Sequence, residues 1–157
     1  MSPDATRVLV IGVGNTYRGD DGAGIAVARQ LAKEVHPGVR VIEHSGDGAA
    51  LVELWRGADS VVVVDAIQSD AKAGTIRRLD VARQVIPAEL FRCSTHAFGV
   101  GNAIELARAF KELPSQLVIY GIEAQTFAAG EKLSPQVEKA VRTVAAQVLA
   151  DCSNRAR

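Results

Sequence analysis

Short apolar runs alternate with helical periodicities along the chain of 157 residues. Three fully apolar runs, at 8–11, 61–64 and 117–120, predict strands, and the β-branched run at 8–11 is typical of a strand buried on both faces. Val39, Val41 and Ile42 indicate another strand that ends near Glu43-His44. A weaker alternating run over 74–80 indicates a further strand at a sheet edge. The pattern therefore predicts a sheet made mainly of buried strands.

Between these runs, apolar residues recur at helical spacing. The spacing predicts helices over 25–35, 51–55, 100–110 and 135–149, and His36-Pro37-Gly38 is expected to stop the first of them. The polar tail over 151–157 is expected to fray. Alternation of strands and helices predicts an α/β protein of three layers, α/β/α, with a twisted, mostly parallel sheet between helices. Neither a repeat nor a linker is visible, so residues 1–157 are expected to form a single domain.

Composition and charge exclude several classes of protein. Hydrophobic residues make up 48% and charged residues 23%, as in ordinary globular domains. Lys and Arg number 18, as do Asp and Glu, whereas nucleic-acid binders usually carry a basic excess. No apolar run reaches the roughly 18 residues of a membrane span, and the N-terminus lacks the pattern of a signal peptide. Cys93 and Cys152 form no CxxC motif, so we expect a protein of the reducing cytoplasm. From the balanced charge and the lack of a long apolar run, we expect it to bind neither nucleic acid nor membrane.

The loop over 12–24 follows the first strand and opens the first helix, where a dinucleotide fingerprint would lie. Tyr17 occupies the position of the third glycine, and no Gly-Lys-Ser/Thr of a P-loop follows. Asp20 and Asp21 at the helix start would repel a pyrophosphate. The loop is therefore predicted to present carboxylates, although each aspartate alone is also a good helix-capping residue.

Two further candidates follow other strands or precede a helix. Asp65 ends the run of four valines, and His96 lies in a polar loop before the third helix. In open parallel sheets, ligands bind at the carboxyl ends of the strands. Asp21, Asp65 and His96 are therefore expected at one edge. Two carboxylates and one imidazole suit an open site for a divalent ion such as nickel or zinc.

Other polar residues near this edge have simpler alternatives. His44 and Asp47 follow the second strand, where turn chemistry would also account for them. Glu123, just after Gly121, is either a further edge carboxylate or a solvated loop residue. Cys93 lies three residues before His96, a spacing that does not by itself make a catalytic dyad.

Taken together, these motifs resemble the nickel–iron hydrogenase maturation endopeptidases. The matching pieces run from residue 8 to about residue 150: Gly12-Val13-Gly14-Asn15, Gly19-Asp20-Asp21-Gly22-Ala23-Gly24, Val64-Asp65-Ala66, Ser94-Thr95-His96 with Gly99, and Gly121-Ile122-Glu123. Each piece alone is a weak signal, whereas the ordered set is specific. His44-Ser45-Gly46-Asp47 departs from the Asp-Gly-Gly turn that many relatives have after the second strand.

The resemblance implies a cytoplasmic, aspartyl-type protease that removes a short C-terminal extension from the precursor of a [NiFe]-hydrogenase large subunit. The family's metal-contacting positions fall on Asp21, Asp65 and His96, which would also be the catalytic residues. The nickel would come with the precursor, and zinc or cadmium could also occupy the site. His44, Asp47 and Glu123 are the candidates for substrate binding. We expect a monomer.

Two other functions compete with this hypothesis. A chaperone or gating module could hold nickel with the same three ligands and leave the precursor uncut. A nucleotide-binding enzyme of doubly wound type is the other alternative, and Tyr17, Asp20 and Asp21 argue against it.

Overall fold

The structure, a computed structural model, describes residues 6–34, 37–130 and 132–155. Strands and helices alternate, as the hydrophobic pattern predicted. In chain order they are β1 (Val8–Val13), η1 (Gly19–Gly22), α1 (Ala23–Leu31), β2 (Val39–His44), α2 (Gly48–Trp55), β3 (Ser60–Ile67), β4 (Ile76–Asp80), η2 (Ala88–Phe91), α3 (Val100–Ala109), β5 (Gln116–Glu123) and α4 (Pro135–Arg155).

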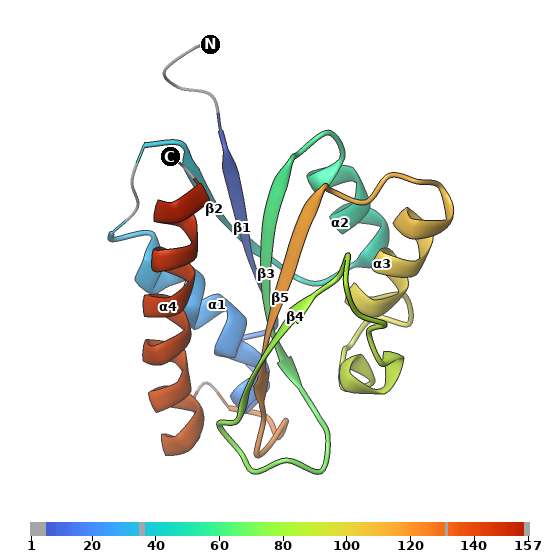
Figure 1. Cartoon of the computed structure of the whole chain (residues 1–157). Coiled ribbons are helices and arrows are strands. Elements are labelled where there is room, and N and C mark those ends of the chain that lie inside the picture. The colour runs from blue at the N-terminus through green and yellow to red at the C-terminus, as the bar shows by residue number, and fades with distance from the viewer. Residues whose placement is uncertain (1–5, 35–36, 131, 156–157) are drawn as a thin grey trace.

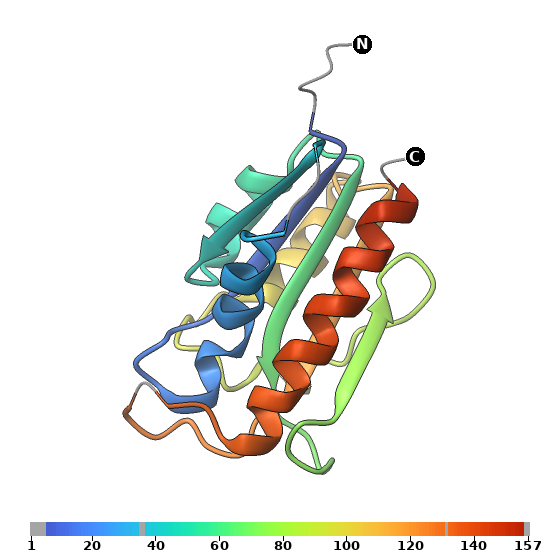
Figure 2. The ribbon, with the colours of Figure 1, turned by 90° about the vertical axis from the view of Figure 1, so that its left-hand side faces the viewer.

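The five strands form one sheet in the order β2-β1-β3-β5-β4. All neighbours are parallel except β4, which runs antiparallel to β5 at the edge. Helices α1 and α4 cover one face and α2 and α3 cover the other (Figure 1). Figure 2 shows α1 and α4 side by side on their face, and the two helices are in contact. The predicted three-layer α/β/α architecture is confirmed.

The apolar side chains divide into two cores, one on each face of the sheet. Val61 and Val63 of β3 pack in the core beneath α2 and α3, whereas Val62 and Val64 pack in the core beneath α1 and α4. All four valines are fully buried, so the central strand has no polar face. This double burial explains why the strand reads as an uninterrupted apolar run.

All four parallel strands extend further than their apolar runs suggest, and β2, β3 and β5 take in the candidate residues His44, Asp65 and Glu123. β3 continues to Ile67 and β5 to Glu123, because their backbones stay paired at Asp65↔Gly121 and Ile67↔Glu123. The placement of Asp65 at the strand tip and of Glu123 in a loop is therefore corrected. Both residues lie within central strands near the carboxyl edge.

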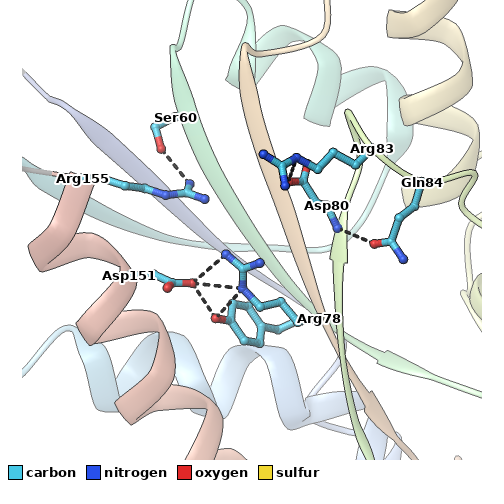
Figure 3. A network of polar contacts seen from close by, with 8 residues as sticks. Ser60, Arg78, Asp80, Arg83, Gln84, Asp151 and Arg155 are labelled. Carbon is cyan, nitrogen blue, oxygen red and sulfur yellow. Dashed lines mark hydrogen bonds and ion pairs between the residues drawn. The ribbon is translucent and has the colours of Figure 1, made fainter.

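The C-terminal segment also differs from the prediction. We expected residues 151–157 to fray, yet α4 is helical through Arg155. Cys152 is buried, and the Arg155 guanidinium donates to Ser60 Oγ over 2.8 Å. Asp151 accepts hydrogen bonds from Arg78 and from the Tyr120 hydroxyl (Figure 3). These contacts fasten the last turns of α4 to the sheet.

A few expectations fall on other parts of the chain. The first helix ends at Leu31, while Val35 and His36 of the predicted helix end lie outside the described residues, as do residues 156–157. None of the helices in the described ranges is both long enough and apolar enough to cross a membrane.

Candidate active site

The loop between β1 and α1 brings Asp21 to the carboxyl edge of the sheet. Helix α1 begins against the strands because residue 24 is glycine. A Cβ at Gly24 would lie 2.3 Å from the carbonyl oxygens of both Val13 and Val64. The short helix η1, which carries Asp21, directly precedes α1 and contacts β3.

Asp21 and Asp65 line the same small cavity, whose volume is about 10 Å³. Their exposed fractions are only 5% and 6%. The guanidinium of Arg18 lies 3.4 Å from the Asp21 carboxylate and also donates to the Cys93 carbonyl over 3.2 Å. Arg18 was not among the predicted site residues, because in the sequence its only signal is that it lies in the same loop as Asp21.

Burial changes the acidity of both carboxyl groups. It raises the pKa of Asp65 well above the ordinary value, and the negative charge of Asp21 raises it further. Burial also raises the pKa of Asp21, although Arg18 and the backbone of Asn15 oppose the rise. A carboxyl group with a raised pKa is suited to accept and return a proton near neutral pH. The pair is therefore chemically prepared for acid–base work.

His96 lies in the adjoining pocket, which has a volume of about 510 Å³. Its backbone amide donates to Ser94 Oγ over 3.1 Å, which fixes the loop. The two pockets share Gly14, Ser45 and Thr95 as lining residues. The charge of His96 lowers the pKa of Asp21, so the two groups interact. The structure thus brings Asp21, Asp65 and His96 to one edge of the sheet.

The donor atoms of these residues suit nickel or zinc in type, since both metals accept carboxylate and imidazole ligands. Within the ranges that the structure describes, no group of three or more His, Cys, Asp or Glu is placed so as to hold a metal ion. The three-ligand site stays a prediction.

His44 and Asp47 have different surroundings. His44 lines the pocket of His96, and its Nδ1 accepts a hydrogen bond from the Gly46 amide over 2.9 Å. Burial lowers the pKa of His44, and His96 lowers it further, while Asp47 opposes the change. Asp47 caps α2, because its carboxylate accepts from the Ala49 amide over 3.2 Å. His44 therefore lines the pocket of His96, and its contact with a substrate stays a prediction, whereas turn chemistry accounts for Asp47.

Glu123 is buried and already has partners. Its exposed fraction is 1%, and its carboxylate accepts hydrogen bonds from the amide and the hydroxyl of Ser69. The side chain therefore anchors the loop after β3. Such burial fits neither the solvated loop residue nor the substrate-binding carboxylate that we had predicted.

Cys93 lines the cavity of the two aspartates, a placement that its spacing from His96 did not indicate. Burial and the charges of Asp65 and Asp21 raise the pKa of its thiol to about 12. A thiol that stays protonated at neutral pH is a poor nucleophile. Cys93 therefore shapes the cavity wall.

Comparison with known proteins agrees with this geometry. The family model described as HycI, hydrogenase maturation protease, matches residues 25–151. The hydrogenase 2 maturation protease of Escherichia coli is 29% identical over 149 residues, covering 92% of this chain and 89% of that protein.

Solved structures share the fold. The hydrogenase maturating endopeptidase HybD from E. coli superposes with a TM-score of 0.76 at 24% identity, covering 95% of this chain and 93% of that one. The [NiFe] hydrogenase maturation protease HybD from Thermococcus kodakarensis superposes with a TM-score of 0.68 at 27% identity, covering 91% of this chain and 97% of that one. Because the family model spans most of the chain, this protein is a hydrolase that belongs to the hydrogenase maturation protease family.

Proposed function

We propose that this protein removes the C-terminal extension of a [NiFe]-hydrogenase large-subunit precursor, and that Asp21, Asp65 and His96 contact the nickel that the precursor carries. The observation that supports this most is the pair of buried carboxylates at one sheet edge. Ionised carboxylates are costly to bury without a cation. Asp21 already lies beside Arg18, whereas none of the ion pairs among the described residues involves Asp65. The pair therefore favours an incoming metal ion, which would compensate the charge that Arg18 leaves.

In this proposal nickel is part of the substrate. A metal that arrives with ligands of the precursor needs only a few donors from the protease. A resident metal needs a closed set of ligands, and among the described residues no group of three or more His, Cys, Asp or Glu is placed to supply one.

Hydrolysis adds water to the scissile carbonyl and breaks its bond to the amine nitrogen of the extension. Nickel beside that carbonyl would polarise it or lower the pKa of a bound water. Asp65, with its raised pKa, is the residue best suited to take a proton from the water and deliver it to the leaving amine. Asp21 is the alternative base, and His96 completes the metal contact.

The three residues come from one chain, so the proposed site needs no second copy and we expect a monomer. Cys93 and Cys152 are both free thiols, which suits a reducing compartment. We therefore place the reaction in the cytoplasm.

The test is the intact mass of the cognate precursor after incubation with the protein. Nickel-loaded precursor is expected to lose a discrete C-terminal peptide, whereas metal-free precursor keeps its full mass. If a nickel-loaded precursor forms a complex yet keeps its extension, the protein is a chaperone or gating module and the proposed endopeptidase is wrong. Equal cleavage with and without nickel would overturn the metal-reading role.

A further inference from the structure

A second, basic pocket lies beyond the candidate site. Its volume is about 750 Å³, and the side chains that characterise it are Tyr17, Arg29, Lys33, Leu133 and Arg142. Three of these are cationic, and among the described residues no carboxylate lines the pocket. Its walls come from the Tyr17 loop, from α1, and from α4 with the segment before it. Helices α1 and α4 lie side by side in Figure 2.

Two of the three cations are available to a ligand. Arg29 is already paired with Glu43 over 3.1 Å. Within the described part of the chain, Lys33 and Arg142 take part in no ion pair with an acidic side chain, and both are exposed. The pocket therefore presents two uncompensated positive charges.

The basic pocket is continuous with the candidate site. It shares Thr16, Tyr17 and Arg29 with the pocket of His96, which in turn adjoins the cavity of Asp21 and Asp65. The Tyr17 ring, 67% exposed, stands where the two larger pockets meet. A path thus leads from the buried carboxylates, past an exposed aromatic ring, to the two free cations.

We propose that Lys33 and Arg142 bind the terminal carboxylate of the precursor's C-terminal extension. This inference rests on the proposed function. The nickel centre would hold the upstream part of the precursor at Asp21, Asp65 and His96, so the chain beyond the scissile bond is the segment free to follow the path. An extended segment advances about 3.3 Å per residue, and the pockets share lining residues, so the extension can follow them without a break.

Charge complementarity supports the chain end as the occupant. A free C-terminus is ionised at neutral pH, since its ordinary pKa is about 3.5. Every extension carries this group whatever its sequence, and Tyr17 offers apolar surface to the residues before it. Recognition of the chain end would restrict cleavage to precursors whose extension has the matching length.

The test uses two synthetic peptides with the sequence of the cognate extension, one with a free carboxylate and one with a terminal carboxamide. Their Kd values are measured against wild type and Lys33→Gln/Arg142→Gln. The matched control is Arg40→Gln/Lys72→Gln, which removes two exposed cations outside the pocket. Wild type and the control should bind the free acid about tenfold more tightly than the carboxamide, as two partly screened ion pairs allow.

The pocket variant should lose that preference, with the affinity of the carboxamide unchanged. Equal binding of both peptides by wild type would overturn the proposal. So would a pocket variant that weakens both peptides alike, because the cations would then contact another part of the extension.

This assay separates the inference from the proposed function, since peptide binding needs neither nickel nor cleavage. Asp21→Asn should bind both peptides as wild type does. Cleavage of the precursor by a protein that does not discriminate the peptides would defeat only the chain-end inference. Discrimination without cleavage would defeat only the proposed endopeptidase.

Discussion

Ser134 and Asp20 are joined by two hydrogen bonds across 114 residues of sequence. The amide and the hydroxyl of Ser134 each donate to the Asp20 carboxylate over 2.7 Å. The amides of Gln125 and Thr126 donate to the same group over 2.8 and 3.1 Å. Asp20 therefore fastens the segment between β5 and α4 to the turn that carries Asp21. Two aspartates adjacent in sequence thus have separate tasks, one structural and one at the candidate site.

Asp20→Ala is expected to lower the free energy of unfolding by about 3 kcal/mol, because four donors to a buried carboxylate lose their acceptor. Ser134→Ala removes only the hydroxyl donor and should cost about 1 kcal/mol. Urea denaturation at neutral pH measures both values. Asp59→Ala, an exposed aspartate just before β3, is the control and should unfold like wild type. A stability of Asp20→Ala close to that of the control would contradict the anchoring role.

The raised pKa of Asp65 predicts a dependence of stability on pH in the metal-free protein. The native state binds the proton of the Asp65 carboxyl more tightly than the unfolded chain does. In the unfolded chain the pKa of this group is near 3.8. The stabilising contribution of protonated Asp65 is therefore full below that value and is lost as pH rises through the folded pKa. Asp65→Asn, which cannot ionise, should be more stable than wild type at neutral pH. The gain should shrink as pH falls toward about 4.

Denaturant unfolding of both proteins in the presence of a chelator, at several pH values between about 4 and 8, measures this difference. Asp59→Asn serves as the control and should show no such trend. A difference between Asp65→Asn and wild type that stays constant with pH would mean that Asp65 does not ionise in this range.

The hydrophobic pattern of the sequence predicted the architecture correctly, but it did not predict where the strands end. The run Val61–Val64 identifies the doubly buried part of β3, yet pairing with β5 carries the strand on through Asp65. Apolar patterning reports side-chain burial, whereas a strand continues as long as its backbone has a partner. The same reason explains Glu123, whose buried carboxylate is satisfied by Ser69, a residue 54 positions away.

The alternation of strands and helices was enough to predict that Asp21, Asp65 and His96 lie at the carboxyl ends of the strands, and the structure places them there. The separate roles of Asp20 and Asp21 could not be predicted, because the two aspartates are adjacent in one loop of the sequence. Their difference depends on contacts between Asp20 and residues 125–134, and nothing near Asp20 in the sequence reports such distant contacts.

Substituting Gly24 tests whether α1 must lie as close to the sheet as it does. A Cβ there would lie 2.3 Å from two backbone carbonyl oxygens, so Gly24→Ala forces the helix away from β1 and β3. We expect a loss of about 3 kcal/mol or more, comparable with severe overpacking. Gly101→Ala in α3 is the control, since its Cβ would come no closer than 3.4 Å to a neighbour. It should be neutral or gain about 0.5–1 kcal/mol in helix propensity. Equal stability of the two variants, measured by thermal unfolding, would contradict the close approach.

Tyr120 provides a second pH-dependent contact, at the other end of α4 from Ser134. Burial first, and the hydrogen bond to Asp151 second, raise the pKa of its hydroxyl to about 12 from the ordinary 10.0. Arg78 donates to the Tyr120 hydroxyl over 3.2 Å. It also donates to the Asp151 carboxylate, as the dashed lines of Figure 3 show. The contribution of this hydroxyl to stability is full below the unfolded value and is lost as pH rises toward the folded one.

Tyr120→Phe should therefore be less stable than wild type at neutral pH by about 1–2 kcal/mol, since a hydrogen bond to a charged group is lost. The difference should narrow as the solution becomes strongly alkaline. Chemical denaturation across that range measures it, and exposed Tyr17→Phe is the control. A difference that grows in alkali would show that the native state favours the ionised phenol, contrary to the geometry.

The most direct test of the site is the intact mass of nickel-loaded precursor after incubation with Asp21→Asn, Asp65→Asn and His96→Ala. The control is Asp59→Asn, which makes the same chemical change as the first two variants, but just before the amino-terminal end of β3 and so away from the candidate site. Circular dichroism and thermal unfolding confirm that each variant is folded. We predict that all three site variants leave the precursor at its full mass, while wild type and Asp59→Asn release the C-terminal peptide. Processing at the wild-type rate by the folded site variants would contradict the assignment of these residues.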